Sequence, residues 1–128
     1  MLSQEHVTLA EVLERTVSPE AFATAVRALS RRVEQEGVRE LLTLQFYADP
    51  GSTRIGAVLT FANSEAFRHH IRLVGAWEEF HAFAAAVRLV DIRVYGELPL
   101  EAEAWVRQFG EVGQTFRDHV AGFVRPPQ

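Results

Sequence analysis

The chain has 128 residues, enough for one domain with a substantial core, and it contains no cysteine, which excludes disulfides and thiolate metal sites. Its formal net charge is −4, its non-histidine cations are all arginines, and these form no cluster of the kind that nucleic-acid binding requires. No apolar run approaches the roughly 20 residues that span a bilayer, and the polar N-terminus does not resemble a secretory signal. We therefore expect a cytoplasmic protein whose partners are neither nucleic acid nor membrane.

The first predicted elements are a strand and a helix. Residues 7–13 alternate in hydrophobicity, which predicts a strand with one buried face, although Glu11 interrupts that face. Ser18 and Pro19 are typical of a helix start, and Gly37 can end the helix. Between them one apolar stripe has helical spacing and consists of Phe22, Val26, Leu29 and Val33.

A β-hairpin follows, and it is the clearest motif in the sequence. Residues 41–48 and 54–61 both alternate as strands, and Asp49-Pro50-Gly51-Ser52 between them has the composition of a turn. Next, Asn63 or Ser64 is expected to cap a second helix from Glu65 to about Val87. The apolar stripe of that helix changes phase at Gly75, which predicts a kink or a break there.

Residues 89–95 are predicted to form a fourth strand, and Leu100 to about Val120 a third helix. The stripe of the third helix consists of Trp105, Phe109, Val112, Phe116 and Val120. The order β-α-β-β-α-β predicts an α+β, ferredoxin-like sandwich with an extra C-terminal helix. We expect residues 1–97 to form the ferredoxin-like domain, and residues 98–128 to be its C-terminal helical extension.

Two helices can cover only one face of such a sheet. We expect that face to carry Leu42, Leu44, Phe46, Ile55, Leu59, Phe61, Val90, Ile92 and Val94. The opposite face would carry Val12, Leu41, Tyr47, Val58, Leu89, Tyr95, Thr8, Thr43, Gln45, Arg54, Asp91 and Arg93. This face is too apolar to remain exposed to solvent and too polar to form an ordinary core. Either the helix of Trp105 covers it, or the sheet of a second subunit does; a homodimer would enclose a polar-lined cavity suited to a ligand.

The order of elements and several local stretches resemble the antibiotic-biosynthesis-monooxygenase-like domains of the dimeric α+β barrel superfamily. The matching stretches are Glu65-Ala66-Phe67-Arg68-His69-His70-Ile71, Trp77-Glu78-Glu79-Phe80 and Val90-Asp91-Ile92-Arg93-Val94-Tyr95. The resemblance covers residues 7–96 and implies a dimer that oxidises activated aromatic or quinol-type substrates with O₂, often without metal or flavin. A heme-degrading branch uses an asparagine on the first strand, and it is disfavoured because the only asparagine here is Asn63.

His70 falls where this family places its histidine, and a histidine with a pKa near neutrality suits the removal of a phenolic proton. Phe67, Trp77 and Phe80 would line an apolar pocket, and His81 would lie on the same side of a straight helix as His70. The alternative is that the aromatic residues belong to the core and that the histidines lie at the surface or have other partners. No cofactor is expected, and no metal, because His70 and His81 would lie roughly 16 Å apart along a helix.

Asp91 and Arg93 share one face of the fourth strand and would orient a substrate, with Gln45, Tyr47 and Tyr95 as neighbours. The alternative is an ion pair between subunits. The sequence thus predicts a homodimer that binds a small, largely apolar or aromatic molecule. The family resemblance implies that it acts as a cofactor-independent monooxygenase with His70 as base. A non-catalytic ligand-binding module and a structural dimerisation module are the alternatives.

Overall fold

The computed structural model describes residues 5–125 as an α+β fold in which one mixed sheet packs against a layer of helices. The elements are β1 (Val7–Arg15), α2 (Pro19–Glu36), β2 (Leu41–Ala48), β3 (Arg54–Phe61), α3 (Ser64–Val74), α4 (Glu78–Ala85), β4 (Val87–Tyr95), α5 (Leu100–Arg107), the 3₁₀ turn η1 (Gly110–Val112) and β5 (Gly113–Phe116). The strand order is β2-β3-β1-β4-β5; all neighbours are antiparallel except β4 and β5, which are parallel. The predicted ferredoxin-like order is confirmed.

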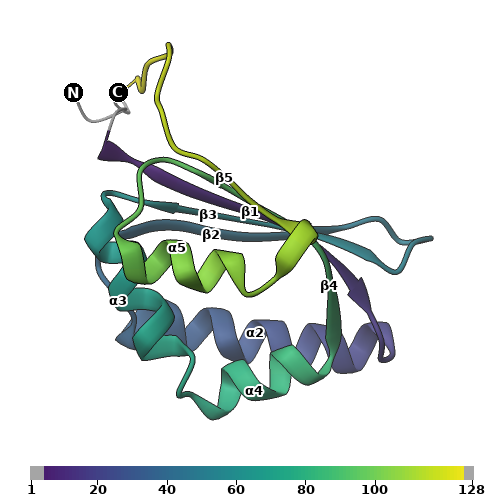
Figure 1. The fold of residues 1–128 in the computed structure, drawn as a ribbon. Helices are drawn as coiled ribbons and strands as arrows, with labels where there is room; N and C mark the ends of the chain where they lie inside the picture. Colours follow the sequence, from purple (N-terminus) through teal and green to yellow (C-terminus); the bar gives the residue numbers. More distant parts are fainter. Residues whose placement is uncertain (1–4, 126–128) are drawn as a thin grey trace.

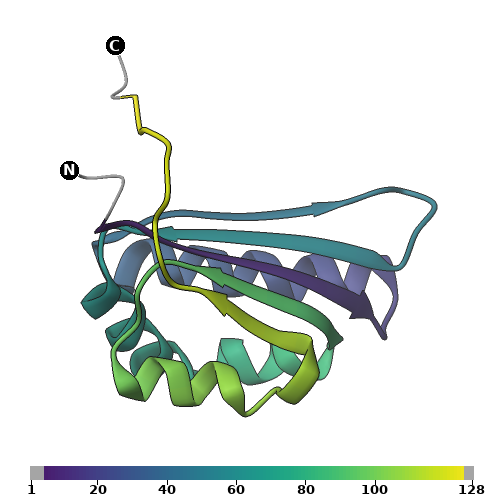
Figure 2. The same ribbon diagram turned by 45° about the horizontal axis from the view of Figure 1, so that its top comes forward.

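The helices lie together on one face of the sheet, and in residues 5–125 no helix lies on the other face (Figures 1 and 2). The helix α5 belongs to this layer, where Trp105 packs edge-on against Phe67 with ring centroids 5.7 Å apart. The possibility that the helix of Trp105 covers the opposite face is therefore wrong. The core forms between the two layers around fully buried side chains such as Phe61, Phe67 and Ile92.

The ends of α2 and the break after α3 follow the local sequence. Ser18 caps α2 by accepting a hydrogen bond from the Ala21 amide at 3.1 Å. The predicted second helix is divided into α3 and α4 at Gly75, as expected. At Gly75 a Cβ atom would lie 2.9 Å from the Ile71 carbonyl oxygen, so glycine allows the chain to turn closely there.

Two register shifts change the predicted assignment of side chains to the faces of the sheet. One shift lies between Leu41 and Thr43, and the other lies where β4 pairs with Val12 and Leu13. Because an extra residue inverts the alternation beyond it, Leu41 and Leu89 pack into the core beneath the helices, contrary to prediction. Leu42, predicted to face the helices, is 52% exposed. Val90 has no pairing partner and is only half-buried.

The helix in the C-terminal extension is shorter than predicted. The helix α5 ends at Arg107, and residues 113–116 form β5 instead of continuing the helix to Val120. Gly110 adopts a φ of +62°, which favours glycine, and at Gly113 a Cβ atom would approach the Val106 carbonyl oxygen to 2.6 Å. These two glycines turn the chain back, so that β5 adds a fifth strand beside β4.

Candidate functional site

A cavity of about 280 Å³ lies between the sheet and the helices. Its floor comes from β1 to β4, and its walls come from α2, α3, α4, α5 and adjoining residues. Most of the lining is aliphatic or aromatic, including Leu9, Leu44, Phe46, Phe80, Phe83 and Trp105. This volume is close to the lower end of the range found for ligand pockets, about 300 Å³, so the space has room for one small organic ligand.

Two ionisable side chains line this apolar space, and they come from opposite layers of the fold. Glu11 lies on β1, where it pairs with Ala57 of β3 on one side and Ile92 of β4 on the other. His70 lies on α3, with its ring edge-on to Phe61 at a centroid distance of 5.2 Å. The site therefore combines one carboxyl group from the sheet with one imidazole from the helices.

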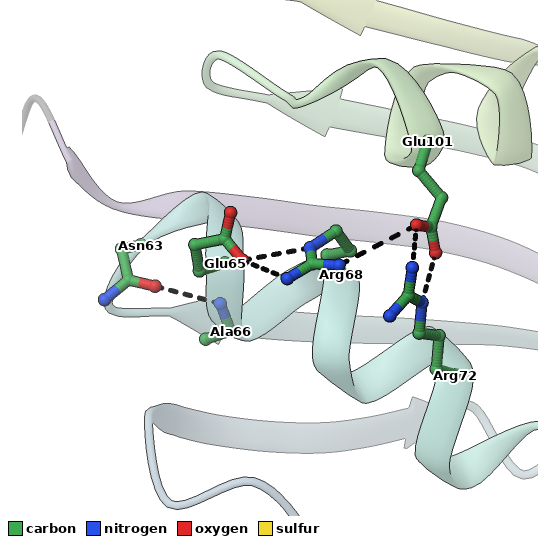
Figure 3. Close-up of polar contacts among 6 residues, drawn as sticks. All are labelled: Asn63, Glu65, Ala66, Arg68, Arg72 and Glu101. Atoms are coloured by element: carbon green, nitrogen blue, oxygen red, sulfur yellow. Dashed lines mark hydrogen bonds and ion pairs between the residues drawn. The ribbon is translucent and has the colours of Figure 1, made fainter.

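Polar contacts at the surface hold α3, the helix that carries His70. Asn63 caps its N-terminus by accepting a hydrogen bond from the Ala66 amide at 2.9 Å (Figure 3). Arg72 of α3 donates two hydrogen bonds to Glu101 of α5, one of them at 2.5 Å, and Arg68 lies 3.8 Å from the same carboxylate. These contacts join α3 to α5, the two helices that bring His70 and Trp105 to the cavity.

Burial changes the pKa values of the two ionisable groups in opposite directions. Burial raises the pKa of Glu11 from 4.5 to about 7. Burial lowers the pKa of His70 from 6.5 to about 4, with a smaller effect from the positive charge of His69. The Nδ1 atom of His70 is buried and has no hydrogen-bond partner among the described residues.

The consequence is a site with a neutral imidazole and a carboxyl group that is about half ionised at neutral pH. The neutral His70 can accept a hydrogen bond from a ligand, but its pKa of about 4 makes it a weaker base than a histidine with the expected pKa near neutrality. Glu11 exchanges its proton near pH 7, so it can serve as a hydrogen-bond donor or acceptor. Groups tuned in this way inside an apolar cavity are typical of ligand-binding and catalytic sites.

The structure separates the predicted helical site residues. His70 and Phe80 line the cavity, and Phe67 lies behind it in contact with the rings of Phe61 and Trp105. Trp77 is buried, 7% exposed, at the N-terminus of α4, with the Arg32 guanidinium 4.4 Å from its ring centre; it is not part of the cavity lining. His81 is exposed. The break at Gly75 removes the shared helix side on which His70, Trp77 and His81 were placed together.

The predicted strand residues lie on the face without helices. Gln45, Tyr47 and Tyr95 are exposed there, and Asp91 forms an ion pair with Arg93 within the same strand. The sheet lies between this group and His70, so the chain does not bring the two predicted sets into one pocket. The ion pair is intramolecular, whereas the sequence suggested a substrate contact or a pair between subunits.

Glu11 is the site residue that the sequence analysis did not identify. Its signal is present in the sequence, because within residues 7–13 Glu11 is the only charged residue at an inward position and the other inward residues are Val7, Leu9 and Leu13. In the strand pattern alone the residue is an interruption of the alternation, and only the opposing helices show that its carboxyl group faces a cavity.

Within residues 5–125 no helix combines the length and hydrophobicity needed to cross a membrane. Within the same residues no three histidine, aspartate or glutamate side chains gather as potential metal ligands.

The fold is shared with several solved structures. MupZ from Pseudomonas fluorescens matches with a TM-score of 0.70 and 18% identity, over 96% of this chain and 91% of its own. SnoaB, a cofactor-independent oxygenase from Streptomyces nogalater, matches with a TM-score of 0.58 and 10% identity, over 74% of this chain and 95% of its own. A Caulobacter crescentus protein provisionally named as an antibiotic biosynthesis monooxygenase matches with a TM-score of 0.58 and 16% identity, over 71% of this chain and 88% of its own.

No family model and no curated protein sequence matches the chain. At these low identities the structural matches establish the fold, and they confirm the predicted ferredoxin-like architecture of antibiotic-biosynthesis-monooxygenase-like proteins. The match to MupZ leaves only 4% of this chain uncovered, so it extends into the segment of α5 and β5. The C-terminal addition is therefore a feature that the two structures share.

Proposed function

We propose that this protein binds a small aromatic molecule in the cavity between the sheet and the helices, and oxidises it with O₂ without a bound cofactor. The observation that carries the proposal is the cavity itself, which is apolar, of ligand size, and contains a neutral imidazole with an unpartnered nitrogen. The fold shared with SnoaB, a cofactor-independent oxygenase, supports the same class of reaction.

In the proposed reaction, His70 accepts the proton of a phenolic hydroxyl. The resulting electron-rich ring reacts with O₂, which is itself apolar and is favoured by the surrounding Phe80, Phe83 and Trp105 side chains. One oxygen atom becomes a new hydroxyl oxygen on the ring, and the other leaves as water with the two hydrogens that the substrate loses. A quinol and O₂ therefore give a hydroxyquinone and water, with no other reductant.

The substitution His70→Ala tests this proposal. We expect oxygen uptake with an activated quinol to fall by about 100-fold or more, because a general base contributes roughly that factor. The matched control is His69→Ala, since His69 is exposed on the same helix and should leave uptake unchanged. Equal uptake by the wild type and the His70→Ala variant would reject His70 as the base.

A non-catalytic ligand-binding module is the second candidate, because the same cavity supports binding without chemistry. Under this alternative an aromatic ligand would bind to the purified protein while oxygen uptake stayed at the rate of the buffer. Anaerobic binding and aerobic oxygen uptake measured on one preparation distinguish the two. The purely structural module has less support, since a cavity of about 280 Å³ remains open in the interior.

We also propose that the protein acts as a homodimer through the face of the sheet without helices. In the described residues this face exposes Tyr47 (63%), Leu42 (52%) and Tyr95 (46%), the last stacked on Phe116. The segment after β5 projects from the sheet away from the helices (Figures 1 and 2). It presents Phe123, which is 72% exposed. Apolar groups in these positions favour burial against a second copy.

Light scattering at micromolar concentration tests the dimer. The wild type should have twice the mass of one chain, and Tyr47→Glu should have the mass of one chain, because a carboxylate would lose its hydration in the interface. Arg31→Glu, a charge change on the exposed side of α2, should remain a dimer. A wild-type mass of a single chain would reject the proposed interface.

A further inference from the structure

We infer that Glu11 is a second polar anchor of the cavity, so that its ligand is a small aromatic molecule with two oxygen functions, one bound by Glu11 and one by His70. This inference rests on the proposed use of the cavity as a ligand site, and it does not require that the ligand be oxidised. It concerns a residue on the sheet, whereas the proposed base lies on the helix layer.

The position of Glu11 is not explained by packing. Leu9 and Leu13, its neighbours on the same face of β1, are both 3% exposed, and its cross-strand partners are Ala57 and Ile92. The Glu11 side chain is half-buried, and within residues 5–125 its carboxyl group forms no ion pair and no side-chain hydrogen bond. A carboxyl group without a partner destabilises such a site, and a leucine there would satisfy the alternation of the strand. The partner of the Glu11 carboxyl group is therefore a bound ligand.

The surroundings of Glu11 restrict what that partner can be. Around the cavity, α2 contributes Leu29 and Val33, and the lining residues of α4 and α5 are apolar or aromatic. His70 of α3 is the one other titratable group among the described residues that line the space. A ligand must therefore be apolar in its body and polar at two places, near the sheet and near α3. A ring with two hydroxyl or carbonyl oxygens has this pattern.

The protonation states fit the two redox forms of such a ring. An ionised Glu11 and a neutral His70 are both hydrogen-bond acceptors, which suits the two hydroxyl groups of a quinol. A protonated Glu11 is a donor, which suits a quinone oxygen. Because the pKa of Glu11 is about 7, the site can change between these states near neutral pH. Binding of a quinol should therefore favour loss of the Glu11 proton, and the affinity for it should rise with pH.

The experiment compares two probes under argon, where neither is oxidised: 1,4-dihydroxynaphthalene and its monomethyl ether. Calorimetry on the full chain at pH 8 should give about tenfold tighter binding of the dihydroxy probe, the factor expected for one hydrogen bond to a charged group. In Glu11→Gln this preference should fall to about twofold or less. Glu34→Gln, the same change at an exposed position of α2, should retain it.

If Glu11 had a purely structural role, the preference for the dihydroxy probe would not change with pH. In the wild type the preference for the dihydroxy probe should increase between pH 6 and pH 8, and in Glu11→Gln it should be independent of pH. A second variant, Glu11→Leu, should keep the fold because it restores the apolar alternation, and it should bind naphthalene at least as well as the wild type does. A preference that is unchanged in both variants would overturn the inference.

The result separates this inference from the proposed oxidation. A wild type that prefers the dihydroxy probe through Glu11 but consumes no oxygen would support the anchor and reject the oxidation. If oxygen uptake depended on His70 while the preference for the dihydroxy probe did not depend on Glu11, the oxidation would be supported and the anchor rejected. Failure of the wild type to bind either probe would overturn the anchor.

Discussion

The two faces of the sheet carry polar groups in different ways. The strand residues that line the cavity beneath the helices are apolar except Glu11, whereas the other face of the sheet mixes Thr, Gln, Arg and Asp side chains with exposed aromatic rings. A polar residue on the open face is hydrated or paired, as Asp91 and Arg93 are. A polar residue on the covered face must find its partner inside the protein. The comparison shows that one carboxyl group in an apolar wall is more informative about function than many polar groups on an open surface.

The largest difference between the faces should appear in stability. Phe61→Ala should lower the free energy of unfolding by about 3–5 kcal/mol, because it empties a fully buried site between Phe67 and His70. Tyr47→Ala on the open face should change the unfolding of a single chain by about 0.5 kcal/mol or less. Urea denaturation at low protein concentration measures both values. Equal losses would mean that the open face is also buried under those conditions.

The second-largest effect is expected in the pH dependence of stability, and it comes from Glu11 on the face covered by the helices. The pKa of Glu11 is about 7 in the folded chain and 4.5 unfolded, so the folded chain holds the proton more tightly. Stability attributable to Glu11 is therefore full below pH 4.5, falls as the pH rises towards 7, and stays low above it. Glu11→Gln should be more stable than the wild type at pH 8, by at most about 3 kcal/mol, and the difference should vanish near pH 4.

His70 has the opposite dependence. Its pKa is about 4 in the folded chain and 6.5 unfolded, so stability falls as the pH drops from 6.5 towards 4. In the wild type the two slopes oppose each other between pH 4.5 and 6.5. The Glu11→Gln variant should therefore reveal the slope of His70 alone. A flat stability profile for that variant over this range would contradict the burial of the imidazole.

The smallest effect is expected at the surface contact between α3 and α5. Arg72 and Glu101 are hydrogen-bonded but largely exposed, so Arg72→Ala should cost no more than about 1 kcal/mol. A double-mutant cycle with Glu101→Ala isolates the pair, and Arg107→Ala on α5 is a control outside it. A coupling energy well above 1 kcal/mol would show that this contact contributes to the rigidity of the cavity wall.

Much of the architecture could be predicted because its signals are local. Ser18 and Pro19 set the start of α2, the turn at residues 49–52 sets the hairpin, and Gly75 sets the break between α3 and α4. The extent of α5 could not be predicted from its stripe of aromatic residues. The pairing of β5 with β4, together with the conformations of Gly110 and Gly113, outweighs that helical spacing.

The candidate site was predicted only in part for a related reason. His70 and Phe80 were identified from the helix and the family resemblance, and both line the cavity. Tyr47 and Arg93 do lie on the face opposite the helices, as the alternation predicts, but the sheet separates them from His70, so they cannot share its pocket. Glu11 interrupts the alternation of β1 in the sequence, but only the opposing helices show that it faces a cavity.

By itself, the sequence determined the order of elements, the caps, the hairpin and the helix break, since each depends on residues a few positions apart. The tertiary structure alone decided the faces of Leu41, Leu42 and Leu89, because one extra residue in β2 and another in β4 invert the alternation there. It also decided where the site lies: the cavity is formed by segments from Leu9 to Phe109. The protonation of Glu11 and His70 depends on how completely those distant segments exclude water.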